Sequence, residues 1–136
     1  MSSRIISTSD FSSKDVRKAI WEHSSSRIAL VTSYWDGKHN VMTCEWFTQI
    51  QFNPPRYLIA LVKGYTSVKY IEKSREFGIT FLSDDQTKFS KHAGNTSGNE
   101  IDKFAEIKYP HRPGVDINPK IITGGVLALE CRVIRS

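Results

Sequence analysis

The spacing of apolar and polar positions predicts short strands joined by a few short helices. At the start, apolar residues recur at helical spacing from about Lys14 to His23, with Val16 and Ile20 on one face. Ser12 or Ser13 is suited to cap this helix, because a serine hydroxyl can accept a hydrogen bond from a free N–H of the first turn. We therefore expect one helix before the first strand.

A hairpin and a further strand are predicted next. Arg27–Ser33 is rich in β-forming residues, Asp36-Gly37 is a turn signal, and Asn40–Phe47 resumes the strand pattern. Asn53-Pro54-Pro55 interrupts it, since proline cannot donate a hydrogen bond to a central strand. The apolar stretch Arg56–Val62 then predicts a buried strand.

Two helices and a strand are predicted in the middle of the chain. Thr66–Ser74 has apolar residues at helical spacing, with Thr66 or Ser67 as the N-cap. Phe77–Leu82 predicts a strand and Asp84–His92 a second short helix, opened by Ser83 or Asp84. The Gly94–Gly98 segment predicts a mobile surface loop that could act as a lid.

The last third of the chain is less regular. Ile101–Ile107 predicts one or two helical turns, and the prolines between Pro110 and Pro119 predict an irregular stretch. Gly125–Ile134 alternates as a strand, which places four side chains on one face: Leu127, Leu129, Cys131 and Val133. Because the strands do not alternate with long helices, the pattern favours a mostly β, antiparallel barrel with short peripheral helices over a doubly wound sheet.

Composition narrows the class of protein. A chain of 136 residues suits a single domain, here residues 1–136, and its apolar stretches are too short to span a bilayer. The first residues lack the apolar core of a secretory signal, so cytoplasmic residence is expected. The net charge is +5, and the Lys and Arg residues are scattered along the chain rather than clustered. This pattern favours a phosphate-bearing small ligand over nucleic acid or a membrane surface.

Common catalytic motifs are absent from the sequence. It has no Gly-x-Gly-x-x-Gly after a strand, no Gly-Lys-Ser/Thr phosphate loop and no serine nucleophile elbow. Its four histidines and two cysteines lack metal-ligand spacing, so structural or solvated roles are expected for the histidines and no metal site is predicted. Cys131 is interpreted as a small buried hydrophobe, whereas the role of Cys44 stays open.

An ordered series of short motifs remains between Ile28 and Val133. They are Ile28-Ala-Leu-Val-Thr-Ser, Asp36-Gly37, Asn40-x-Met-Thr-Cys-Glu-Trp-Phe, Phe52-Asn-Pro-Pro, Leu58-Ile-Ala-Leu, Thr66-x-x-x-Tyr-Ile, Phe77-Gly-Ile-Thr-Phe-Leu, Asp102-Lys-Phe and Leu129-Glu-Cys. Their order and spacing resemble those of the flavin reductase-like family of FMN-binding split barrels, which includes the flavoredoxins. The resemblance implies an antiparallel split β-barrel of Greek-key type.

The resemblance also implies where FMN would bind. In that family the strand after the first hairpin turn lines the isoalloxazine ring, which here places six residues at the ring: Thr43, Cys44, Glu45, Trp46, Phe47 and Thr48. Backbone groups can meet the polar rim of a flavin while side chains cover its faces. The loop and helix that follow would receive the phosphate through Lys63, Thr66, Ser67 and Lys69, and Ser90 and Lys91 would approach the cofactor.

The implied activity is hydride transfer from NADH or NADPH to FMN, for delivery to a small or protein acceptor. No catalytic acid or base is needed, because the protein has only to position two rings face to face. The family resemblance further implies a homodimer and a flavin-dependent monooxygenase component as a partner. Family members usually continue into a Gly-Asp-His motif and further strands, so a form shortened at the C-terminus is expected.

Three alternatives stay open. The chain could keep FMN tightly as an electron carrier or a ferric reductase. A basic barrel could instead bind nucleic acid on stacking platforms such as Trp35, Trp46 and Tyr65. Cys44, finally, could act near the flavin by its shape and electronic effect or as a redox-active thiol, which would need a lowered pKa.

Overall fold

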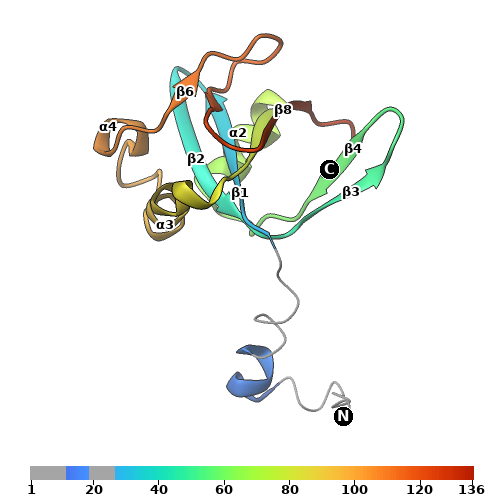
Figure 1. Cartoon of the computed structure of the whole chain (residues 1–136), viewed down its shortest axis with the longest axis vertical. Coiled ribbons are helices and arrows are strands. Elements are labelled where there is room, and N and C mark those ends of the chain that lie inside the picture. Colours follow the sequence, from blue (N-terminus) through green and yellow to red (C-terminus); the bar gives the residue numbers. More distant parts are fainter. Residues whose placement is uncertain (1–11, 19–26) are drawn as a thin grey trace.

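A four-stranded antiparallel sheet forms the centre of the computed structural model, which describes residues 12–18 and 27–136 (Figure 1). The strand order is β2-β1-β5-β8. The bounds are β1 (Ala29–Trp35), β2 (Lys38–Cys44), β5 (Glu76–Phe81) and β8 (Leu127–Arg132). Asp36 and Gly37 both have positive φ in the turn that joins β1 to β2, as a two-residue Asp-Gly hairpin requires.

Both faces of this sheet are covered. α2 (Thr66–Ser74) packs on one face, where the buried cluster consists of Ala29, Val31, Cys44, Ile71, Phe77 and Ile79. The other face carries η2 (Asp84–Gln86), α3 (Thr87–Asn95), α4 (Lys103–Glu106) and the short pair β6 (His111–Arg112) and β7 (Ile121–Ile122). Its buried cluster is Leu30, Val41, Phe89, Ala93, Tyr109 and Ile122.

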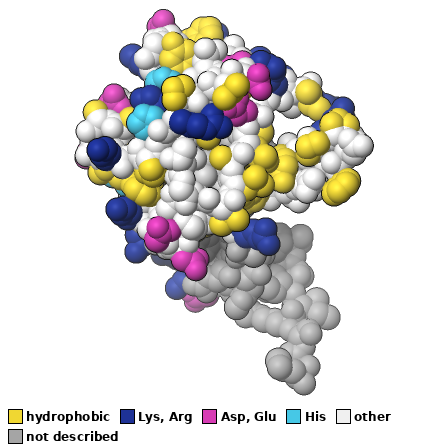
Figure 2. Space-filling view, turned by 45° about the horizontal axis from the view of Figure 1, so that its top comes forward, with side chains coloured by type: hydrophobic (Ala, Val, Ile, Leu, Met, Phe, Trp, Pro, Cys, Tyr) yellow, Lys and Arg dark blue, Asp and Glu magenta, His cyan; other side chains and the backbone are white. Residues whose placement is uncertain are grey.

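The remaining hairpin projects from this body as an arm (Figure 1). It consists of β3 (Phe47–Gln51) and β4 (Arg56–Ile59), which pair only with each other. Apolar side chains lie exposed along it, with Phe52 88% exposed at its tip (Figure 2). The prediction of a buried strand over Arg56–Val62 is therefore wrong, since β4 ends at Ile59 and alternates between exposed and half-buried positions.

Most other predicted elements are confirmed. α2 has the predicted bounds and β5 differs from the prediction by one residue at each end, but the N-cap of α2 is Tyr65 rather than Thr66 or Ser67. The predicted loop at Gly94 begins later, because α3 continues to Asn95. Residues 14–18 are helical as predicted, and the rest of that predicted helix, with Ile20 and His23, lies outside the described residues.

The fold class is confirmed as mostly β with antiparallel strands and short helices. In the part of the chain that the structure describes, the sheet stays open, with β2 and β8 as its two edges. No helix in residues 12–18 and 27–136 has both the length and the apolar composition needed to cross a bilayer.

Two glutamates hold the 112–119 segment against the sheet. Glu130 on β8 accepts the backbone N–H groups of Val115 at 2.8 Å and Asp116 at 2.7 Å, and Arg112 pairs with the same carboxylate. Glu76 on β5 likewise accepts the N–H of Asn118 at 3.0 Å. The hydrogen bond from the Val115 N–H lowers the pKa of Glu130, and the backbone N–H of Asp116 and the guanidinium of Arg112 lower it further. The predicted irregular stretch thus contains one short paired strand, β6, and its part from Val115 to Asn118 is fixed by charge-assisted hydrogen bonds.

We expect Glu130→Gln to lower the free energy of unfolding at pH 7 by about 1–2 kcal/mol, because an amide accepts these N–H groups more weakly. A lowered pKa in the folded state means that the carboxylate stabilises the fold above the ordinary glutamate pKa of about 4.3. This contribution is lost as the pH falls through the lowered pKa. Urea unfolding at neutral and acid pH measures the difference, which should shrink on acidification.

The control is Glu72→Gln, on the exposed side of α2, which should change the free energy of unfolding by less than about 0.5 kcal/mol. Equal stability of the two variants at pH 7 would contradict the role given to Glu130.

Candidate functional site

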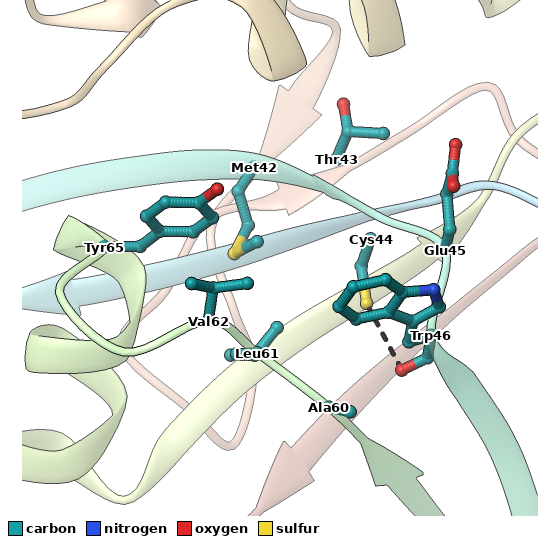
Figure 3. A pocket seen from close by; sticks show the side chains of 9 residues that line it. All are labelled: Met42, Thr43, Cys44, Glu45, Trp46, Ala60, Leu61, Val62 and Tyr65. Atoms are coloured by element: carbon teal, nitrogen blue, oxygen red, sulfur yellow. Dashed lines mark hydrogen bonds between the residues drawn. The ribbon is translucent and has the colours of Figure 1, made fainter. Parts of the chain in front are cut away.

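A pocket opens where two chain segments part at the base of the arm (Figure 3). The β3–β4 ladder ends with the pair Phe47↔Ile59, followed by one more hydrogen bond from the Ala60 N–H to the Trp46 carbonyl at 2.8 Å. Beyond it, residues 42–44 continue back along β2 to pair with β1, whereas residues 60–65 run to α2. The pocket is the space between these diverging segments.

The pocket has a volume of about 200 Å³, and apolar side chains line it together with polar groups. Its lining residues are Met42, Thr43, Cys44, Glu45, Trp46, Ala60, Leu61, Val62 and Tyr65. Strand alternation sends Met42 and Cys44 to the face of the sheet that α2 covers, and Thr43 to the opposite face (Figure 3). The interior is thus formed by a thioether, a thiol and aliphatic carbon.

Cys44 lies at the inner end of the pocket as a protonated thiol. Its side chain is buried, and its Sγ donates to the Trp46 carbonyl over 3.7 Å, the same oxygen that accepts the Ala60 N–H. Burial raises the pKa of Cys44. A raised pKa opposes the reactive-thiol interpretation, since the thiolate is the nucleophile. Cys131 is likewise a free thiol whose pKa burial raises to about 11.

Two exposed aromatic side chains border the pocket at opposite ends (Figure 3). The Trp46 indole lies over Cys44, and Tyr65 lies at the end where α2 begins. Trp46 is 55% exposed and Tyr65 52% exposed. Flat ring faces beside an apolar pocket suit an aromatic ligand.

Buried hydrogen bonds shape the start of α2, next to Tyr65. Thr66 Oγ1 donates to Asn99 Oδ1 at 2.8 Å, and Asn40 Nδ2 donates to Ser67 Oγ at 2.9 Å. A Cβ atom on Gly98 would lie 2.4 Å from Asn40 Oδ1, so this glycine allows the 96–100 loop to approach β2. The loop predicted as a mobile lid is therefore attached to α2 and β2 in this structure.

The outer edge of β2, behind the pocket, is held by α3 and α4. Thr43 Oγ1 donates to the Ser90 carbonyl, and Lys103 Nζ donates to the carbonyls of Val41 and Ala93, both at 2.8 Å. Lys103 is only 3% exposed, and burial lowers its pKa to about 8. A side-chain ammonium thus takes the place that a neighbouring strand would occupy beside Val41.

The structure brings together four of the predicted ring-binding residues: Thr43, Cys44, Glu45 and Trp46. The other two lie on the arm, because the predicted continuous strand breaks at Glu45-Trp46; there, Phe47 packs against Phe81 and Thr48 is exposed.

The residues predicted to receive the phosphate, and the two predicted to approach the cofactor from the second helix, do not line the pocket. The lysines, Lys63, Lys69 and Lys91, are exposed at the surface. Thr66 and Ser67 are buried and bonded as described above, whereas the Ser90 hydroxyl bonds to the Thr87 carbonyl. Roles in cofactor binding for all twelve residues stay predictions.

Sequence reasoning missed one whole wall of the pocket. Ala60, Leu61 and Val62 were predicted as part of a buried strand, because an apolar run alone does not distinguish a core strand from a pocket wall. Tyr65 was considered only as a stacking platform for nucleic acid. Asn40 and Lys103 were also missed as contributors, although both occur in the motifs quoted above. A lysine directly after a helix cap, as in Asp102-Lys103, gives no sign of burial.

Three of the four histidines, His39, His92 and His111, lie within the described residues. Among the residues that the structure describes, no three histidine, cysteine or acidic side chains are grouped to hold a metal ion. His92 contacts the Tyr109 hydroxyl at 2.6 Å and Glu106 at 3.2 Å, and His39 packs against the rings of Tyr34 and Phe104. His23 lies outside the described residues.

Comparison with known proteins gives a family match over most of the chain. Residues 21–136 match the family described as flavin reductase like domain. The chain is 28% identical over 121 residues to the uncharacterized protein YddH of Escherichia coli strain K12, covering 82% of the chain and 64% of that protein. It is 30% identical over 112 residues to the reductase component of a 4-nitrophenol 4-monooxygenase/4-nitrocatechol 2-monooxygenase of Rhodococcus opacus, covering 82% and 57%.

Solved structures show the same fold. The flavoredoxin of Desulfovibrio vulgaris (Miyazaki F) superposes with a TM-score of 0.76 at 25% identity, covering 82% of this chain and 61% of that one. The chain thus spans between half and two thirds of the length of the curated relatives above.

We expect Lys103→Met to change how stability depends on pH. Because the pKa of Lys103 is about 8 in the folded protein and about 10.4 in an unfolded chain, the unfolded state binds the proton more tightly between these values. The stability of the wild type relative to the variant should therefore rise, by up to about 3 kcal/mol, between pH 8 and pH 10.5. Urea unfolding of both proteins across this range measures it.

The matched control is Lys108→Met, which replaces an exposed lysine and should follow the wild type at every pH. A difference between wild type and Lys103→Met that stays flat or falls above pH 8 would show that Lys103 is not held as described.

Proposed function

Because the chain belongs to the flavin reductase-like domain family, we propose that it binds FMN in the pocket between residues 42–46 and 60–65 and passes electrons from NADH or NADPH to a further acceptor. The observation that carries the proposal is the pocket itself. It combines apolar side chains in its interior with a flat indole at one end and the start of a helix at the other. FMN has matching parts, a flat ring system at one end and a phosphate at the other.

The ring end of FMN fits the part of the pocket near Trp46. The backbone ladder stops at the Trp46 carbonyl, so the backbone of the diverging segments beyond it is available for the polar rim of a flavin. Met42 and Cys44 offer apolar contact to one face, and the indole offers stacking.

The phosphate end fits the start of α2. Tyr65, the N-cap residue, makes no side-chain hydrogen bond to the first turn, so backbone N–H groups there are available to an anion. Lys63 adds an exposed positive charge two residues earlier. Thr66 donates its only hydroxyl proton to Asn99, so we infer that Thr66 and Ser67 shape this end of the site while N–H groups and Lys63 contact the phosphate.

The redox chemistry is that of FMN, which can accept a hydride and a proton. The side chains around the pocket are suited to excluding water and aligning rings, and no acid or base among them is needed. The Rhodococcus opacus relative is a reductase component of a monooxygenase, and we propose a monooxygenase component as an acceptor for this chain too. The carrier alternative differs only in holding FMN more tightly.

We expect saturable FMN binding to the purified apoprotein, followed by flavin-dependent oxidation of NADH or NADPH. Trp46→Ala should weaken FMN binding about tenfold, because a lost ring stack amounts to about 1–1.5 kcal/mol. Flavin fluorescence titration measures binding, and the absorbance of the reduced nicotinamide measures turnover.

Trp35→Ala is the control, since Trp35 is an exposed tryptophan at the far end of β1 from the pocket. Absence of both flavin binding and nicotinamide oxidation would refute the proposal. Binding without oxidation would leave the carrier alternative, and flavin-independent, salt-sensitive binding of single-stranded nucleic acid would support the nucleic-acid alternative.

We also propose that the exposed arm pairs two copies of the chain. Ile50 and Leu58 are 59% and 50% exposed, and with Phe52 they give the arm an apolar surface that a second copy would bury. Sedimentation equilibrium should report twice the chain mass for the wild type and a monomer for Phe52→Asp, with Trp35→Asp unchanged from the wild type. A monomeric wild type would refute this arrangement.

A further inference from the structure

Basic side chains surround one aromatic ring beside the start of β2. The ring belongs to Phe104 on α4, and the Lys120 ammonium lies 4.7 Å from its centroid. Two histidine rings lie nearly perpendicular to it, with centroids 5.5 Å away for His111 and 6.3 Å away for His39. The contact between α4 and this end of β2 is therefore made by one cation and two groups that can become cations.

His39 is the member of this cluster least able to carry a second proton. Its ring is half-buried and packs against Tyr34 of β1, with centroids 4.6 Å apart. Its Nδ1 atom is buried and has no hydrogen-bond partner in the part of the chain that the structure describes. His111 differs, because its Nδ1–H donates to the Tyr109 carbonyl at 2.8 Å. A doubly protonated His39 would bury an N–H without an acceptor, which is costly.

The charged groups that face His39 also oppose its protonation. Burial lowers the pKa of His39, and the charges of Lys120 and His111 lower it further. The Asp102 carboxylate raises it, but this carboxylate also accepts two backbone N–H groups of the first turn of α4, at 3.1 and 3.3 Å. The folded protein thus favours a neutral imidazole at this position.

The same contact supports the open edge of β2. Lys103 on α4 donates to the Val41 carbonyl of β2 and to the Ala93 carbonyl of α3. Val41 and His39 are two residues apart on one strand, so both face α4. A charge that pushes α4 away from His39 would therefore loosen the bond that Lys103 makes to the strand.

We propose that His39, Phe104 and Lys120 form an acid-sensitive latch between β2 and α4, which is closed while His39 is neutral and loosens when His39 binds a proton. The latch lies near the turn that joins β1 to β2, at the opposite end of β2 from the pocket. Its action needs no flavin, so it can be tested whether or not the proposed function is correct.

The direction of the pH effect follows from the lowered pKa of His39. An ordinary histidine in an unfolded or opened segment has a pKa of about 6.5, so the open form binds the proton more tightly than the closed form. The latch is therefore fully stabilising above about pH 6.5, and this contribution is lost as the pH falls through the lowered pKa of the closed form.

Amide hydrogen exchange of the wild type and His39→Phe at pH 7.5 and pH 5 tests the latch. Phenylalanine keeps a ring in the cluster but cannot bind a proton. In the wild type, the Ile107 N–H donates to the Lys103 carbonyl at the end of α4. After correction for the intrinsic exchange rate, its protection should fall about fivefold or more at pH 5, the factor that corresponds to about 1 kcal/mol for one unpaired buried N–H.

His39→Phe should lose less than twofold of this protection over the same pH range. The Arg75 N–H, which donates to the Ile71 carbonyl at the end of α2, is the reference amide on the other face of the sheet. Its protection should fall less than that of Ile107 in the wild type.

The imidazole titration of His39, followed by NMR, is the second measurement. In the wild type His39 should titrate below pH 6.5, and in Lys120→Met it should titrate at a higher pH than in the wild type, because the Lys120 charge lowers its pKa. The matched control is Lys108→Met, which removes an exposed lysine and should leave the titration of His39 unchanged.

An equal loss of protection at Ile107 in the wild type and in His39→Phe would refute the latch. A His39 that titrates at pH 6.5 or above, or one that does not respond to Lys120→Met, would refute it as well. If His39→Phe does not fold, the titrations of the wild type and Lys120→Met decide the question. FMN binding enters none of these measurements, so failure of the latch and failure of the proposed function are separate results.

Discussion

The hydrogen bond from the Ala60 N–H to the Trp46 carbonyl determines where the site can be. It is the last backbone hydrogen bond between the two sides of the arm. Beyond it, the two segments lead to different elements of the fold. Residues 42–44 belong to β2 and pair with β1, whereas residues after Ala60 lead into α2 on one face of the sheet. A gap between two well-anchored segments is the direct result, and Cys44 supports the junction by donating to the same carbonyl.

The geometry of this gap depends on how firmly β2 is held in place. As an edge strand it has backbone pairing on one side only, and side chains from other elements hold the rest. Lys103 and Thr43 connect its outer edge to α3, and Asn40 connects it to the start of α2. These bonds fix both the ring end and the phosphate end of the proposed flavin site relative to one strand. A site built on a strand that is fixed by hydrogen bonds on both edges is better suited to aligning two rings than a site built on loops.

Local patterns predicted several elements correctly but not the pocket, and they missed the break between β2 and β3 and the early end of β4. The Asp36-Gly37 turn, α2 and the alternation in β8 follow from turn chemistry and periodicity within a few neighbouring residues. The family resemblance placed Thr43 to Trp46 at the ring, and all four line the pocket. The opposite wall, Ala60 to Val62, could not be recognised, because its apolar residues look the same whether they face a core or a ligand. The burial of Lys103 depends on contacts with β2 and α3, distant in sequence, that no local pattern encodes.

The central claim is that a flavin lies between residues 42–46 and 60–65. The most direct measurement is titration of isotopically labelled protein with FMN, followed by NMR of the backbone amides. The account predicts saturable shifts concentrated in these two segments and at the first turn of α2, with little change in the 112–119 segment held by Glu130 and Glu76. Shifts centred on another part of the molecule, or no saturable shift at all, would contradict it.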